Sequence, residues 1–218
     1  KFHISLLKKD FNVPDLFSRG PSDAKEGDEP WWTFQNFKRR MIPGVYPFAL
    51  RYEQRDYTKP RKFRIGKNKI FAINGVTFVC RYPNKGAEKW AKIFGLKILV
   101  SKNNLTEVKL GNHTLTWVTP SKFGDLYGKD AWLPPKGNFA HLRKMALLHV
   151  NSETISVTKK YLHESKFKTK YIEIDGEQCL YVFPNPHDGF AFLVKEYNLS
   201  RHMSKIKESG QKLKLERI

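Results

Sequence analysis

Residues 145–194 read MALLHVNSETISVTKKYLHESKFKTKYIEIDGEQCLYVFPNPHDGFAFLV and contain the clearest structural pattern of the chain. The apolar run at 145–150 predicts a buried strand, and Ser152 can cap the helix that follows it. Two further strands flank the turn dipeptide Asp175-Gly176, and a last strand follows at 190–194. This segment therefore predicts one β-α-β-β-β unit.

The same order of elements occurs earlier, in residues 69–119. A buried strand is expected at 70–80, followed by a helix that Asn84 can cap and that Gly95 can end in the left-handed conformation. Three short strands complete this copy, at 96–100, 105–110 and 113–118. The chain thus contains two copies of one unit, and the Pro/Gly-rich segment 122–138 is expected to connect them.

Two motifs in these copies resemble the vicinal oxygen chelate superfamily, which includes glyoxalase I, bleomycin-resistance proteins and extradiol dioxygenases. AEKWAKIFGL at 87–96 is similar to the family helix that ends in an aromatic residue and Gly-Leu. FPNPHDGFAFL at 183–193 is similar to the family's closing turn and strand. The resemblance covers about residues 69–196. It implies an α+β fold in which two βαβββ modules form a curved, cup-shaped mixed sheet.

Enzymes of this superfamily hold a divalent metal in the cup through His on the first strands and Glu on the last strands. The corresponding His-like positions fall at Gly75, or at Asn74 one residue earlier, and at Lys144. The Glu-like position of the second module falls at Leu193, and segment 112–119 of the first module contains no Asp or Glu. Because a metal needs nitrogen or oxygen lone pairs at these positions, we predict no metal site and no cofactor.

Other catalytic patterns are also missing from the sequence. His149 lies five residues beyond Lys144, on the opposite face of the predicted strand, and is interpreted as a core or surface residue. Cys80 and Cys179 lie within apolar strands, which favours buried, unreactive thiols. Phosphate-binding glycine loops and nucleophile-elbow motifs do not occur. We therefore predict no catalytic residue and no enzymatic activity.

The charge of the chain is strongly positive and unevenly distributed. Its 218 residues contain 40 Lys and Arg against 21 Asp and Glu, for a net charge of +19. Residues 34–69 contain 11 Lys and Arg against 2 Asp and Glu, interleaved with aromatic residues. Arg and aromatic side chains together suit RNA, because guanidinium groups bind phosphates and rings stack on bases. An alternative is a solvated basic linker whose aromatic residues pack on their own domain.

Prolines in segment 34–69 disfavour a long helix or a central strand there, so we expect an extended arm. The C-terminal residues 199–218 predict a basic helix that can make a second phosphate contact. The residues predicted to bind RNA are Lys38, Arg39, Arg40, Arg51, Arg55, Lys59, Arg61, Lys62 and Arg64 in the arm, with Arg201 and Lys205 in the C-terminal helix.

These patterns divide the chain into an N-terminal extension with the basic aromatic arm (1–68), a paired βαβββ domain (69–196) and a basic C-terminal helix or tail (197–218). No apolar run approaches the roughly 18 residues that a membrane crossing requires, so no membrane partner is expected. The expected partners are RNA, in particular ribosomal RNA, and neighbouring proteins of a large assembly.

The main functional prediction is a non-catalytic, RNA-binding structural component of a large ribonucleoprotein. The basic extensions resemble those of mitochondrial ribosomal proteins, which implies the ribosome of the mitochondrial matrix as the location. The alternative prediction is a metal-dependent lyase, isomerase or dioxygenase of the vicinal oxygen chelate superfamily. A third possibility is a small-molecule binder that uses the cup without a metal.

Overall fold

The computed structural model describes residues 17–19, 32–36, 48–52, 61–102, 104–134, 144–185, 190–208 and 213–217. The chain divides into two units, residues 1–59 and 60–218. In the first unit, β1 (Phe17–Arg19), β2 (Trp32–Asn36) and β3 (Phe48–Tyr52) form an antiparallel sheet in that order. The second unit contains an eight-stranded sheet and a two-stranded sheet. The domain boundaries predicted at 68/69 and 196/197 stay a prediction.

The first module of the second unit follows the predicted order. It consists of β5 (Ile70–Val79), α2 (Pro83–Phe94), β6 (Ile98–Lys102), β7 (Leu105–Leu110) and β8 (His113–Val118). Gly95 ends α2 with φ 66°, as expected for a left-handed helix end. The predicted cap at Asn84 is wrong, because the helix begins at Pro83 and the Asn84 side chain instead accepts a hydrogen bond from Thr106.

The second module repeats this order. It consists of β9 (Lys144–Ser152), α4 (Ile155–Glu164), β10 (Thr169–Ile174), β11 (Glu177–Val182) and β12 (Ala191–Glu196). The turn residues Asp175 and Gly176 have φ of 53° and 77°, the pair of positive values that a tight hairpin turn requires. Ser152 ends β9 and does not cap α4, whose first backbone N–H is bound by a Glu196 side-chain oxygen at 2.9 Å.

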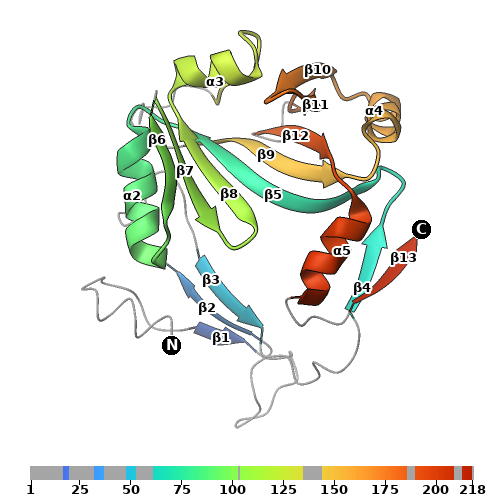
Figure 1. The fold of residues 1–218 in the computed structure, drawn as a ribbon, viewed down its shortest axis with the longest axis horizontal. Coiled ribbons are helices and arrows are strands. Elements are labelled where there is room, and N and C mark those ends of the chain that lie inside the picture. Colours follow the sequence, from blue (N-terminus) through green and yellow to red (C-terminus); the bar gives the residue numbers. More distant parts are fainter. Residues whose placement is uncertain are drawn as a thin grey trace. The chain divides into compact units, whose positions relative to one another are not determined.

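The two modules share one mixed sheet with the strand order β10-β11-β12-β9-β5-β8-β7-β6 (Figure 1). β5 and β9 are antiparallel neighbours at its centre, and each pairs in parallel with the last strand of its own module. The predicted α+β fold with two βαβββ modules and a C-terminal helix is confirmed. Among the described residues, no helix combines the length and apolar composition of a membrane span.

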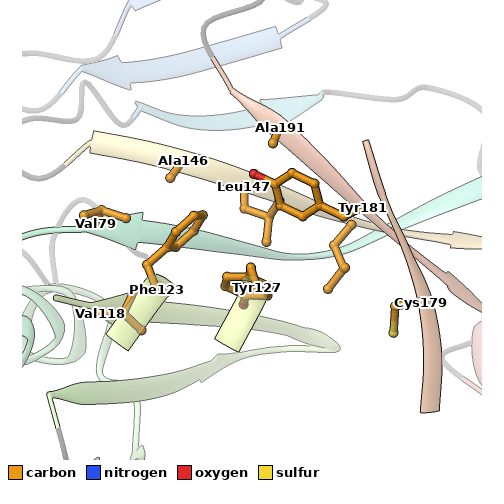
Figure 2. Packing of buried hydrophobic residues seen from close by; sticks show 10 residues of the cluster. Val79, Val118, Phe123, Tyr127, Ala146, Leu147, Cys179, Tyr181 and Ala191 are labelled. Atoms are coloured by element: carbon orange, nitrogen blue, oxygen red, sulfur yellow. The ribbon is translucent and has the colours of Figure 1, made fainter. Parts of the chain in front are cut away.

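Side-chain alternation gives the sheet two differently covered faces. On one face, Trp90 of α2 packs beside Phe78 and Trp117, with ring centroids 6.3 and 6.1 Å away. On the same face, Ile155 of α4 joins a cluster with Val150 and other strand residues. The opposite face carries the larger apolar cluster shown in Figure 2. Helices α2 and α4 pack on the first face only, so other elements must cover the second face.

A short helix, α3 (Pro120–Tyr127), covers part of the second face, within a segment predicted as a plain connection. Thr119 caps α3 by accepting the Lys122 backbone N–H at 3.3 Å. Phe123 and Tyr127 are buried against strand residues that include Leu147 (Figure 2). The predicted connection thus contains a helix that the sequence analysis does not predict, and burial of these two rings stabilises it despite Gly124 in its middle.

Near the C-terminus, α5 (Leu199–Glu208) follows β12 directly, and β13 (Leu213–Arg217) pairs in parallel with β4 (Arg61–Ile65). These two strands form the two-stranded sheet. Part of the predicted arm is therefore strand, since β3 and β4 both lie within residues 34–69.

Candidate functional site

A cavity of about 790 Å³ lies on the second face of the eight-stranded sheet. Strands β5, β7, β8, β9 and β12 supply its floor, and α3, the turn between β10 and β11, and residues at α5 supply the rest of its lining. Tyr127 of α3 belongs to both the apolar cluster and the cavity lining. The helix thus fills one part of the cup and leaves the remainder open to a ligand.

Four residues lie in one row across the floor of this cavity. Gly75 of β5 pairs with Thr114 of β8 on one side and with His149 of β9 on the other. His149 in turn pairs with Leu193 of β12. Directly paired residues point to the same face of a sheet, and all four line the cavity. The row gives each module one first-strand and one last-strand residue at the centre of the cup.

Gly75 is required by a close approach of the neighbouring strand. A Cβ atom at this position would lie 2.6 Å from the Thr114 carbonyl oxygen, a distance at which the backbone must shift. The same Cβ would lie 3.6 Å from the Cβ and Cγ atoms of His149. The first module therefore cannot place a side chain here without moving β8, and His149 is the only imidazole in the row.

His149 is the end of a short chain of hydrogen bonds. Its Nε2 atom lies 2.7 Å from the Thr77 hydroxyl oxygen, which lies 3.3 Å from the hydroxyl oxygen of Tyr127. Thr77 and Tyr127 are buried, and His149 is half-buried at the cavity. The hydrogen bond to Nε2 holds the imidazole ring in place, and the ring also lines the cavity.

Burial keeps this group of side chains uncharged at neutral pH. Burial, and to a lesser extent the charge of Lys195, lower the pKa of His149 to about 4. Burial also raises the pKa of Tyr127 to about 12, although its hydrogen bond with Thr77 acts in the opposite direction. His149 is therefore a neutral imidazole at pH 7, with one donor and one acceptor nitrogen.

Polar side chains continue from His149 along the same face. Asn151, two residues further along β9, accepts a hydrogen bond from the Asn74 side-chain amide at 2.7 Å. Lys195 pairs directly with Asn151 in the parallel register, and its Nζ atom lies 3.6 Å from a Glu177 carboxylate oxygen. One side of the cup therefore combines an imidazole, an amide and an ammonium group.

The residues at the centre of the cup do not fit a bound metal ion. The row of Gly75, Thr114, His149 and Leu193 offers one imidazole, one hydroxyl and no carboxylate. A divalent metal of the kind this fold can hold requires three or four nitrogen or oxygen ligands. Within the part of the chain that the structure describes, no group of three His, Cys, Asp or Glu side chains is placed to hold one. The described residues of the cup therefore do not supply the ligands that the metal-dependent form of the alternative prediction requires.

The structure corrects three sequence predictions in the cup. The His-like position of the second module is not Lys144, because the register with Gly75 and Leu193 places His149 there. His149 is accordingly a residue of the cavity rather than of the core or the outer surface. The predicted placement of Lys144 and His149 on opposite faces is also wrong, because an irregular step in β9 pairs Lys144 with Val79 and His149 with Gly75, two residues on one face of β5.

Of the residues predicted to bind RNA, those of the second unit that the structure describes do not line the cavity. Five of the predicted residues lie outside the described residues: Lys38, Arg39, Arg40, Arg55 and Lys59. The others lie on β3 (Arg51), on β4 (Arg61, Lys62 and Arg64) and on α5 (Arg201 and Lys205). The Arg201 side chain is exposed. Their assignment to RNA stays a prediction, whereas the burial predicted for Cys80 and Cys179 is confirmed.

Comparisons with known proteins agree on the fold. No protein-family model matches the chain, and no curated protein matches it in sequence. A hypothetical protein from Staphylococcus aureus has a similar structure, with a TM-score of 0.51 and 11% identity over 90% of this chain and 61% of its own. At this identity the likeness shows the fold alone.

Two enzymes are also among the similar structures. Methylmalonyl-CoA epimerase from Mycobacterium tuberculosis has a TM-score of 0.41 and 11% identity, over 62% of this chain and 93% of its own. Homoprotocatechuate 2,3-dioxygenase from Brevibacterium fuscum has a TM-score of 0.44 and 13% identity, over 62% of this chain and 34% of its own. Both proteins have the vicinal oxygen chelate fold, and at these identities the likeness shows the fold alone.

The predictions of a ribosomal role and of no enzymatic activity are wrong, because the similar structures include those of an epimerase and a ring-cleaving dioxygenase. These structures favour the alternative prediction, an enzyme of this fold, and give no support to a mitochondrial ribosomal protein. The ribosomal prediction depended on the charge of the extensions. That charge lies mostly outside the eight-stranded sheet and carries no information about the chemistry of the cup.

Proposed function

We propose that this chain is an enzyme that acts on a small organic substrate in the cup without a metal ion, in a proton-transfer reaction of the lyase or isomerase type. The observation that carries this proposal is the neutral imidazole of His149 at the centre of the cavity floor, held through Nε2 by Thr77. A neutral imidazole N–H can donate a hydrogen bond to a substrate oxygen at pH 7 and stabilise the negative charge that develops there when a neighbouring proton is lost.

Three features of the cup support small-molecule chemistry. Its volume of about 790 Å³ lies in the range typical of small-molecule sites. Apolar residues such as Leu193 and Ile174 share its lining with a few polar groups, which is the usual composition of such sites. The hydrogen bonds behind His149 fix the ring before a substrate arrives, so little ordering is required on binding. A dioxygenase reaction is less suitable, since it requires the redox metal that these residues do not hold.

Proton exchange in heavy water tests this proposal. The full chain, treated with a chelator, is incubated in D2O with a panel of small aldehydes, ketones and 2-oxo acids, and loss of the α-proton signals is followed by ¹H NMR. We expect exchange of at least one compound above the uncatalysed rate, abolished by His149→Gln. His163→Gln is the matched control, because His163 is exposed at the last turn of α4 on the other face of the sheet. Equal exchange by both variants, or none by the native chain, would contradict the proposal.

We propose separately that residues 34–69 contact RNA. The support is the net charge of +9 in 36 residues and the interleaving of Arg with aromatic residues. This partner is compatible with catalysis in the cup, because the segment and the cavity lining share no residue. The location in the mitochondrial matrix also stays a prediction.

A further inference from the structure

The hydrogen bonds between Tyr127, Thr77 and His149 can run in only one direction without leaving a buried hydroxyl hydrogen unpaired. Thr77 has a single hydroxyl hydrogen and lies between the Tyr127 oxygen at 3.3 Å and His149 Nε2 at 2.7 Å. Tyr127 is 4% exposed, and among the described residues its hydroxyl has no acceptor other than Thr77. Every hydroxyl hydrogen in this chain of hydrogen bonds is paired within the described residues when the Tyr127 hydroxyl donates to Thr77 and Thr77 donates to His149.

This direction decides which nitrogen of His149 carries the proton. Because Nε2 accepts the hydrogen bond from Thr77, the hydrogen of the neutral ring is on Nδ1. The reverse direction would leave the Tyr127 hydroxyl hydrogen buried without an acceptor, which disfavours that arrangement by about tenfold or more in population. The usual ambiguity between the two neutral forms of histidine is therefore resolved by a tyrosine two hydrogen bonds away.

The protonated Nδ1 atom faces the cavity. Nδ1 has no hydrogen-bond partner among the described residues. Among the described residues, the buried polar side-chain atoms without a partner are the indole nitrogens of Trp90 and Trp117. Nδ1 of His149 is not among them, so it is not buried. An atom that is neither bonded nor buried, on a residue that lines the cavity, is accessible from that cavity.

Two further donors lie beside this Nδ1–H on the same face. The Asn151 side-chain oxygen accepts a hydrogen bond from the Asn74 amide at 2.7 Å. The amide hydrogens of Asn151 can therefore donate to another group. Lys195 lies opposite Asn151 in the register of β9 and β12 and lines the same cavity, and its ammonium group has further hydrogens besides the one directed to Glu177 at 3.6 Å. The acidic residues of the lining, Glu107 and Asp175, lie on β7 and on the turn after β10. His149 and Asn151 lie on β9 and Lys195 on the adjacent β12, so these three donors are neighbours, whereas Lys109 of β7 lies on the same side of the sheet as Glu107.

We propose that these donors, His149 Nδ1–H, the Asn151 amide and the Lys195 ammonium, receive the carboxylate of a small organic acid, and that Thr77 and Tyr127 are positioning residues that keep the His149 proton on Nδ1. This inference rests on the proposed function, since it assigns the substrate class of the same cup.

The position of the ring proton is measured first, without any ligand. Long-range ¹H–¹⁵N correlation spectra of the ¹⁵N-labelled full chain at pH 7 distinguish the two neutral forms of His149. We expect an unprotonated Nε2 in the native chain and in Thr77→Ser, which keeps the hydroxyl group. Thr77→Val has nearly the same shape without the hydroxyl, and we expect it to shift toward the Nε2-protonated form that predominates in free histidine. Protonated Nε2 in the native chain would overturn the inference.

The ligand class is then measured by titration calorimetry with pyruvate and with its uncharged methyl ester. We expect pyruvate to bind the native chain at least about tenfold more tightly than the ester, and Lys195→Met to remove most of this difference. Lys159→Met is the matched control, because Lys159 lies on α4 over the ring of Tyr171. Equal affinity for acid and ester would overturn the carboxylate assignment.

The two proposals fail in different ways. A wrong proton position, or equal affinities for acid and ester, contradicts this inference alone, because proton exchange in D2O by His149 would still support the proposed function. Absence of His149-dependent exchange contradicts the proposed function even if His149 carries its proton on Nδ1.

Discussion

Gly75 and His149 lie directly opposite each other on the two central antiparallel strands of the sheet. The two residues hold equivalent positions in the two modules, yet one has no side chain and the other supplies the imidazole at the floor of the cup. The close approach of the Thr114 carbonyl excludes a side chain at position 75. The cup is therefore asymmetric at this row, with an imidazole on β9 and no side chain at the equivalent position of β5.

Replacement of Gly75 by alanine should destabilise the protein. The added Cβ would lie 2.6 Å from a backbone oxygen of the adjacent strand, so we expect a loss of about 1–3 kcal/mol in the free energy of unfolding, measured by urea denaturation. Gly124→Ala is the control, because a Cβ at Gly124 meets no atom within 4 Å and alanine favours the helix. An equal change in both variants would show that β5 and β8 separate easily.

His149 should make the stability depend on pH. Its pKa is about 4 in the folded protein and near 6.5 when unfolded, so the unfolded chain binds the proton more readily between these values. The resulting stabilisation is complete above about pH 6.5 and is lost as the pH falls toward 4. Relative to His149→Gln, we expect the native chain to lose about 2–3 kcal/mol of unfolding free energy between pH 7 and pH 4.5. Parallel pH profiles for the two proteins would rule out a buried neutral imidazole.

Helix α3 should be essential to the cup. Phe123 is fully buried in the cluster that α3 forms with the sheet (Figure 2), so Phe123→Ala should cost about 3–5 kcal/mol of unfolding free energy. Leu133→Ala is the control, because Leu133 is exposed and should change stability by less than about 0.5 kcal/mol. Similar thermal melting of both variants would mean that α3 is only loosely attached.

RNA binding by the basic arm should depend on salt in a characteristic way. Each phosphate neutralised on a single strand should contribute about −0.7 to the slope of log affinity against log salt. Replacing Arg39, Arg40, Arg61 and Arg64 together with glutamate should abolish binding in filter assays. The control replaces four exposed lysines of the first module, Lys85, Lys89, Lys92 and Lys97, for the same change in charge. Equal loss of binding in both variants would argue for non-specific attraction.

The sequence predicts the repeated module well because its information is local. Gly95, with φ 66°, and the Asp175-Gly176 turn mark element ends through backbone conformations that few residues adopt. Helix α3 escapes prediction because Pro120 and Gly124 indicate a loop, and the favourable burial of its rings depends on strands that are distant in sequence. The spacing of four between Phe123 and Tyr127 is the signal that could have indicated a helix.

The centre of the cup is harder to predict, because it depends on the register between two modules. His149 is recognisable only once β9 is placed against Gly75, and β5 and β9 contain irregular steps in their pairing. Thr77 and Tyr127 are 50 residues apart in the chain and carry no motif. Their hydrogen bond forms because α3 packs on the sheet, and no pattern in the sequence predicts that packing.

The central claim is that the cup binds a small organic acid through His149 without a metal. Titration calorimetry with pyruvate on the chelator-treated full chain tests it most directly. We predict saturable binding at one site in the native chain and at least about tenfold weaker binding in His149→Gln. Binding that appears only after a divalent metal ion is added back, or that is unchanged in His149→Gln, would contradict the claim.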